Sequence, residues 1–126
     1  MKKIKIYSVL SNSDNETTTI EALADYNEME NIIKYTEEEL KVEIKILDNK
    51  VIMKRKNLEY DLNLEFKQNE KIRCKYDVKT IGLDLEVDVY TKTLEIDNNR
   101  IYIEYELFND NKSIGKFEYK LLFMEW

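Results

Sequence analysis

Residues 80–91 decide the fold, and they read Thr-Ile-Gly-Leu-Asp-Leu-Glu-Val-Asp-Val-Tyr-Thr. Large apolar residues fall on every second position from Ile81 to Val89, and acidic residues fill most of the gaps. Successive side chains of an extended strand point to opposite faces, so this spacing gives one apolar face and one charged face. The stretch therefore predicts a long strand. Gly82 lies inside the pattern and predicts a bulge or bend there.

The same alternation recurs along most of the chain, separated by short polar turns rich in Asn and Asp. Only residues 20–31 also suit a helix, because Glu, Ala, Leu and Met are good helix formers; a strand is favoured over residues 17–26. The other expected strands cover residues 3–10, 32–36, 40–46, 51–56, 58–66, 72–78, 101–107 and 115–124. The sequence thus predicts an all-β protein of about nine or ten strands in one meander.

An open sheet of this many antiparallel strands would expose two edges and one apolar face. Closure into an up-and-down barrel removes both problems. We therefore expect a single closed or nearly closed antiparallel up-and-down β-barrel that forms one domain over residues 1–126. A barrel of about eight strands is filled by side chains or holds one small ligand. The large inward residues favour a filled interior, whereas Ala22, Ala24 and Gly82 would leave room near one end.

Composition excludes several kinds of chemistry. The chain has no histidine, so Ser-His and Cys-His catalysis and histidine-ligated metals are unavailable. The single cysteine, Cys74, cannot form an intrachain disulfide and is interpreted as a small apolar filler; this agrees with a reducing compartment and a cytoplasmic location. No apolar run approaches the ~20 residues that span a bilayer. No cofactor is expected, and residues 37–39 lack the loop pattern of a calcium site.

The formal charge of −6 is unevenly distributed. A net acidic surface argues against nonspecific binding to nucleic acid or to anionic membranes. Residues 44–79, however, contain ten basic and six acidic residues. These bases either form a local anion-binding patch or are the solvated outer faces of paired strands, and the second interpretation is favoured.

Five short segments together resemble, in order and spacing, the YwiB-like family of small bacterial proteins. They are residues 4–8 (Ile-Lys-Ile-Tyr-Ser), 33–37 (Ile-Lys-Tyr-Thr-Glu), 44–46 followed by Arg55, 82–87 leading to Thr91, and 101–107. The similarity covers roughly residues 3–124. It implies a calycin-like, lipocalin-resembling β-barrel and no established activity.

The polar residues that match the family are the candidate ligand-binding residues: Tyr35, Glu37, Arg55, Thr91 and Tyr105. We expect Arg55 and Glu37 to meet at the mouth of the barrel, where a guanidinium and a carboxylate would orient a polar head group. The competing interpretation is a structural salt bridge or two unrelated surface charges, and it is the favoured one.

Three functions follow from these observations. The first is a barrel that binds a small, partly apolar ligand, and it ranks slightly ahead of the others. The alternative is a structural or protein-interaction barrel with a filled core. An enzyme is the least favoured, because no spacing identifies an acid and base pair without histidine. The oligomeric state is not predicted.

Overall fold

The computed structural model describes residues 2–125, and within them all regular structure is β-strand. The favoured strand over residues 17–26 is confirmed, and the alternative helix is absent from this part of the chain. The ten strands are β1 (Lys2–Asn12), β2 (Thr17–Asn27), β3 (Ile32–Glu37), β4 (Leu40–Ile46), β5 (Val51–Lys56), β6 (Tyr60–Phe66), β7 (Lys71–Val78), β8 (Leu83–Ile96), β9 (Arg100–Asn109) and β10 (Lys112–Glu125).

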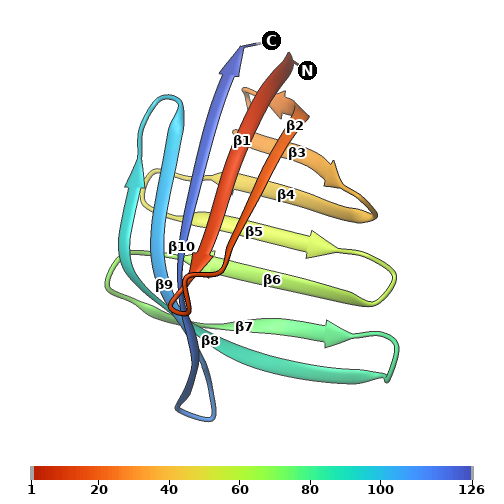
Figure 1. Ribbon diagram of the computed structural model, residues 1–126, viewed down its shortest axis with the longest axis vertical. Helices are drawn as coiled ribbons and strands as arrows, with labels where there is room; N and C mark the ends of the chain where they lie inside the picture. The colour runs from red at the N-terminus through yellow and green to blue at the C-terminus, as the bar shows by residue number, and fades with distance from the viewer. Residues whose placement is uncertain (1, 126) are drawn as a thin grey trace.

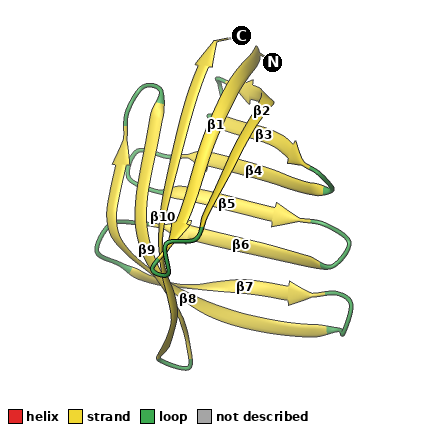
Figure 2. Cartoon of the chain, viewed as in Figure 1, coloured by secondary structure: helices red, strands yellow, loops and turns green. Residues whose placement is uncertain are grey.

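Each strand pairs antiparallel with its neighbour in the chain, and β1 pairs with β10 to close the barrel. The predicted closed up-and-down β-barrel is therefore confirmed. The strands form two groups that cross each other: β1, β2, β9 and β10 run along the long axis, and β3–β7 run across it (Figures 1 and 2). The start of β1 and the end of β10 lie side by side, because these strands are neighbours (Figure 1).

Strand β8 runs from one group to the other, and it differs from its prediction at its start. It begins at Leu83, because Gly82 adopts a φ of 64° and belongs to the preceding turn. The expected bend inside the strand is therefore wrong at Gly82; glycine instead allows the left-handed conformation that the turn needs. A register shift between Thr91 and Thr93 marks a bulge, and bulges increase local bending and twist.

Alternating residues of each strand face inward and form one continuous core. Large side chains occupy most of the buried inward positions, so the middle of the barrel is filled, as close packing of protein interiors leads one to expect. The largest fully buried side chains are Phe66, Ile6, Ile33, Ile44, Ile101, Ile103, Leu121, Val42, Val51, Val89 and Thr91.

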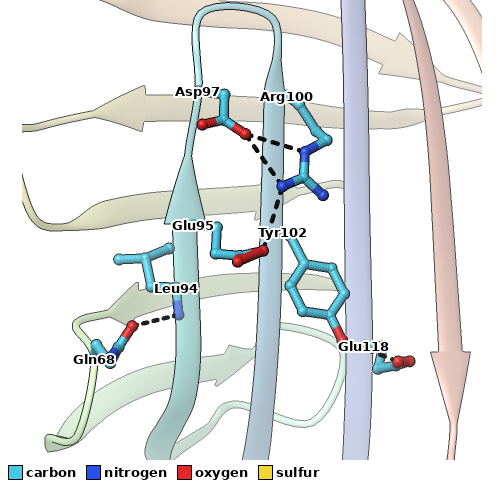
Figure 3. Close-up of polar contacts among 7 residues, drawn as sticks. All are labelled: Gln68, Leu94, Glu95, Asp97, Arg100, Tyr102 and Glu118. Atoms are coloured by element: carbon cyan, nitrogen blue, oxygen red, sulfur yellow. Dashed lines mark hydrogen bonds and ion pairs between the residues drawn. The ribbon is translucent and has the colours of Figure 1, made fainter.

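The ladder of backbone hydrogen bonds between β6 and β7 is short, and a side chain joins the two strands beyond its end. These strands pair only from Tyr60 to Leu62 on the β6 side. Beyond that point the Cys74 sulfur accepts a hydrogen bond from the Glu65 amide. We call this region the β6–β7 seam. In the turn after β6, the Gln68 side chain accepts a hydrogen bond from the Leu94 amide of β8 (Figure 3).

Many outward charges pair across neighbouring strands. Arg100 binds Asp97 and Glu95 at the end of the β8–β9 hairpin (Figure 3). Arg73 of β7 contacts Glu86 and Asp88 of β8. The Arg73 contacts fit the interpretation of the basic residues within 44–79 as outer faces of paired strands, and exposed pairs of this kind contribute only about 0–1 kcal/mol each.

Candidate functional site

Polar side chains occupy seven inward or partly buried positions near one end of the packed core. Each of these residues lies two positions from a buried apolar residue on its own strand, so its side chain points to the same, inward face. We call this set the polar cluster: Ser8 of β1, Tyr35 and Glu37 of β3, Arg55 of β5, Thr91 of β8, Tyr105 of β9 and Tyr119 of β10. Polar residues at so many core positions require a physical explanation, because an unpaired buried polar group is costly.

Arg55 stands in a row of inward residues that crosses six strands. Its register partners are Val42 on one side and Leu62 on the other. The complete row is Tyr35, Val42, Arg55, Leu62, Tyr76 and Leu85. A guanidinium therefore lies among tyrosine and aliphatic side chains rather than on the charged outer face.

The barrel opens beyond this row. On β8, Val87 and Val89 are 8% and 0% exposed, whereas Leu85 and Leu83 on the same face are 39% and 47% exposed. On β6, Leu64 is likewise buried, whereas Leu62 is only half-buried. Arg55 thus lies between the filled core and an apolar rim that solvent can reach.

The Tyr35 ring is buried, and its hydroxyl lies among Tyr119, Ser8, Arg55 and Glu37. Burial raises the pKa of Tyr35. The neighbouring Tyr119 hydroxyl and the Arg55 charge lower this pKa in part, while the Glu37 charge raises it further. The phenol is therefore neutral at pH 7 and can both donate and accept a hydrogen bond.

Tyr105 and Tyr119 are also shifted by burial. Burial raises the pKa of Tyr105 to about 12, opposed by the charge of Arg55. The pKa of Tyr119 rises well above its usual value, mainly by burial and also through Tyr35. Although the Tyr119 hydroxyl lies close to Tyr35, no group among residues 2–125 completes a well-formed hydrogen bond to it.

Thr91 lies directly opposite Tyr105 across the β8–β9 ladder and is fully buried. Its hydroxyl lacks a hydrogen-bond partner among the described residues. The Tyr105 ring is held by Phe66, at 4.8 Å between ring centroids, and by Phe117, at 5.2 Å. Aromatic packing thus fixes Tyr105 on one side of the cluster.

The five residues singled out from the sequence all belong to this region, but Arg55 and Glu37 do not meet. Residues 2–125 contain no ion pair between them, and Arg55 makes no salt bridge there. Both charges act on the Tyr35 hydroxyl instead. Arg55 thus forms no salt bridge with Glu37 among the described residues, and its parity places it on the inward face of β5.

Sequence reasoning missed Ser8 and Tyr119. Each had a signal: Tyr119 shares the inward row of Phe117, Leu121 and Phe123, and Ser8 continues the row of Ile4 and Ile6. A hydroxyl in an otherwise apolar row needs a partner inside the barrel.

Two surface grooves touch members of the cluster. The first has a volume of about 500 Å³, lies between the β1–β2 turn and strands β8–β10, and is bordered by Tyr105. The second has a volume of about 590 Å³, lies over β2–β5, and is bordered by Tyr35. The cluster therefore adjoins the surface on two sides.

Residues 2–125 contain no helix long and apolar enough to cross a membrane. Among the same residues, no group of three acidic, cysteine or histidine side chains is arranged to hold a metal ion.

Comparisons with known proteins agree with this architecture. The crystal structure of the ywiB protein from Bacillus subtilis superimposes with a TM-score of 0.76 over 98% of this chain and 90% of that one. The two sequences are 19% identical, so the likeness shows the fold alone. No curated protein matches the chain. The family described as "Domain of unknown function (DUF1934)" matches residues 4–121. The chain therefore belongs to the DUF1934 family, and its fold is that of a YwiB-like β-barrel.

Proposed function

We propose that this protein binds a small, partly apolar molecule with an anionic head group at the open end of the barrel. The observation that carries the proposal is Arg55, an inward guanidinium without an acidic partner among the described residues. A carboxylate or phosphate is the natural partner of a guanidinium, which offers five donors in a planar fork.

The groups around Arg55 suit such a head group. The hydroxyls of Tyr105 and Tyr119 lie within reach of the Arg55 charge and are neutral at pH 7. The Thr91 hydroxyl, which like that of Tyr119 has no hydrogen-bond partner among residues 2–125, supplies a further donor. An anion held by these groups would offset the cost of their burial.

The rim suits an apolar tail. Leu85 and Leu83 are partly exposed on the inward face of β8, and Leu62 and Tyr76 continue this surface from β6 and β7. A ligand whose head lies at Arg55 would bury these side chains, and each Å² of apolar surface removed from water contributes about 25 cal/mol. The filled middle of the barrel limits the ligand to this end.

Native mass spectrometry of gently purified protein, compared with the denatured mass, tests the proposal. We expect an additional mass that is lost on denaturation and that carries a carboxylate or phosphate. Arg55→Met keeps the aliphatic bulk and removes the charge, so it should abolish the additional mass. The matched control is Lys45→Met, which removes an outward cation of the adjacent strand β4 that forms no ion pair within residues 2–125.

The alternative is a protein-interaction barrel, and exposed apolar side chains favour it. Leu58 and Ile81, at the tips of two neighbouring hairpins, are 86% and 65% exposed. A bare polypeptide mass in both native protein and the Arg55→Met variant would contradict the ligand proposal and leave this alternative. Retention of the additional mass by Arg55→Met would show that the ligand lies elsewhere.

A further inference from the structure

Strand β2 leaves much of one edge free. On one side it pairs with β1 along residues 17–26. On the other side it pairs with β3 only at Asp25, Tyr26 and Asn27. The two strands then diverge, since β2 follows the long axis and β3 runs across it (Figure 1). Within residues 2–125, the backbone of residues 17–24 therefore has no strand partner on the β3 side.

This gap differs from the β6–β7 seam. There, the Cys74 sulfur binds the Glu65 amide, which the ladder leaves unpaired. Between β2 and β3 no comparable side-chain bridge reaches residues 17–24 from β3 or β4 in the part of the chain that the structure describes. The edge also lacks the lysines and prolines with which proteins usually protect exposed edges, since it reads Thr-Thr-Thr-Ile-Glu-Ala-Leu-Ala.

The groove of about 590 Å³ lies where β2 and β3 diverge. Leu23 and Asp25 line it from β2, and Lys34, Tyr35 and Thr36 line it from β3. Its complete basic lining is Lys3, Lys34, Lys41, Lys54 and Lys56, against two acids, Asp25 and Glu43. We call it the lysine groove. It is basic on a protein whose net charge is −6.

Three of these lysines form no ion pair with any residue that the structure describes. Lys3 binds Asp25, and Lys34 lies 3.6 Å from Glu43. Lys41, Lys54 and Lys56 form no ion pair within residues 2–125. Across the β4–β5 ladder Lys54 lies opposite Glu43, whereas Lys41 and Lys56 lie opposite each other. Like charges placed directly opposite destabilise a sheet, so an acidic partner would relieve this repulsion.

We propose that the lysine groove and the free edge of β2 together bind an acidic peptide segment of another protein, which adds to β2 as an extended strand. The backbone of residues 17–24 supplies hydrogen bonds, and the groove lysines supply charge complementarity. Strand addition at an exposed edge is a recurrent mode of peptide recognition, in which backbone bonds give affinity and side-chain contacts give specificity. Leu23, half exposed beside the groove, provides an apolar contact.

A second copy of this chain is the less suitable occupant. Two β2 edges paired to each other would bring two lysine grooves together, and the unpaired cations would repel. An acidic peptide can both pair with the free backbone of residues 17–24 and neutralise the groove lysines.

The test uses a labelled peptide of alternating glutamate and valine, about as long as the free edge. Its control is the same peptide with alternate backbone nitrogens methylated, which keeps the charge and prevents strand pairing. We expect the unmodified peptide to bind at least about tenfold more tightly in fluorescence anisotropy. Amide exchange within residues 17–24 should slow only in its presence.

Charge variants complete the experiment. Lys54→Glu with Lys56→Glu should weaken binding by about tenfold or more. Lys45→Glu with Lys116→Glu, two exposed strand lysines outside the groove, makes the same change in net charge and should bind as the wild type does. Circular dichroism of each variant checks that the barrel is folded.

Four results would overturn the proposal: absence of binding, equal binding of the two peptides, equal binding by the two double variants, or equal binding of a single-stranded oligonucleotide of the same charge. Sedimentation of the protein without peptide tests whether a second copy of the chain occupies the edge instead. A dimer that protects residues 17–24 from exchange would assign the edge to a second copy.

Discussion

The sulfur of Cys74 on β7 lies 3.4 Å from the backbone nitrogen of Glu65 on β6, beyond the point where the ladder between these strands ends. Cys74 also donates to the Ile72 carbonyl, at 3.6 Å. The side chain is buried, as expected for an apolar filler, and it also replaces a missing backbone partner. One small side chain thus holds the β6–β7 seam together.

Cys74→Ala should lower the free energy of unfolding by about 1–3 kcal/mol, because the Glu65 amide loses its acceptor. Cys74→Ser retains an acceptor and should lose less. Urea unfolding measures both. Since burial raises the pKa of the thiol, native protein should also alkylate slowly at pH 7. An alanine variant as stable as the wild type would show that the contact contributes nothing.

Removal of one methyl group should distinguish the core from the rim. Ile44 is fully buried, and Ile44→Val should lower the free energy of unfolding by about 0.5–1.5 kcal/mol. Ile81→Val makes the same chemical change at a turn position that is largely exposed, and should have an effect within about 0.5 kcal/mol of zero. Equal losses in urea unfolding would contradict the division between filled core and open end.

Asp61, Asp77 and Asp84 face one another in a row across β6, β7 and β8. Asp84 raises the pKa of Asp77, with burial and Asp61 adding to the effect. Because the folded pKa exceeds the unfolded one, the folded state binds more protons between the two values, and stability falls as pH rises through that window. Asp84→Asn should therefore raise the melting temperature at pH 7 and have a smaller effect below the ordinary carboxyl pKa.

The control for Asp84→Asn is Glu21→Gln, which makes the same change in net charge. Glu21 is an exposed acid of β2 that forms no ion pair among the described residues. It should leave the melting temperature nearly unchanged at both pH values. A comparable rise in the two variants would attribute the effect to net charge rather than to the aspartate row.

Tyr105 should make stability decrease at alkaline pH. Its folded pKa is about 12, against 10.0 for an ordinary tyrosine, so the unfolded state ionises first. Its contribution is therefore fully present below pH 10 and is lost as pH rises toward 12. Tyr105→Phe should reduce this loss. The control is Tyr7→Phe, because Tyr7 lies on the face of β1 opposite to buried Ile6 and Ser8; this variant should lose stability at alkaline pH as the wild type does. Urea unfolding across this pH range compares the two variants.

Alternation sufficed to predict the strands, because one buried face imposes a period of two on every strand whatever its partner. It also led to the barrel, through the cost of leaving two edges free. It failed at Gly82, where the apolar pattern continues into a turn. Periodicity reports which residues are apolar, whereas the end of a strand depends on backbone conformation, here a positive φ.

The candidate site was predictable only in part. Arg55 and Tyr35 were identified through the match to the family, whereas the hydroxyls of Tyr119 and Ser8 were overlooked in rows that are otherwise apolar. The divergence of β2 from β3 could not be predicted from the sequence of either strand. It arises from how far the ladder extends, and that depends on the twist of the whole barrel rather than on local sequence.

The pairing of Ile4 with Glu125 sets the order in which the molecule can assemble. Every other ladder joins strands that are consecutive in the chain, so each can form soon after its second strand is synthesised. Closure must wait for β10, and until then β1 has an unsatisfied outer edge on the ribosome. Contacts between residues so distant in sequence slow folding and prolong exposure to aggregation. The strand made first is therefore the last to be completed, and the nascent chain is most vulnerable there.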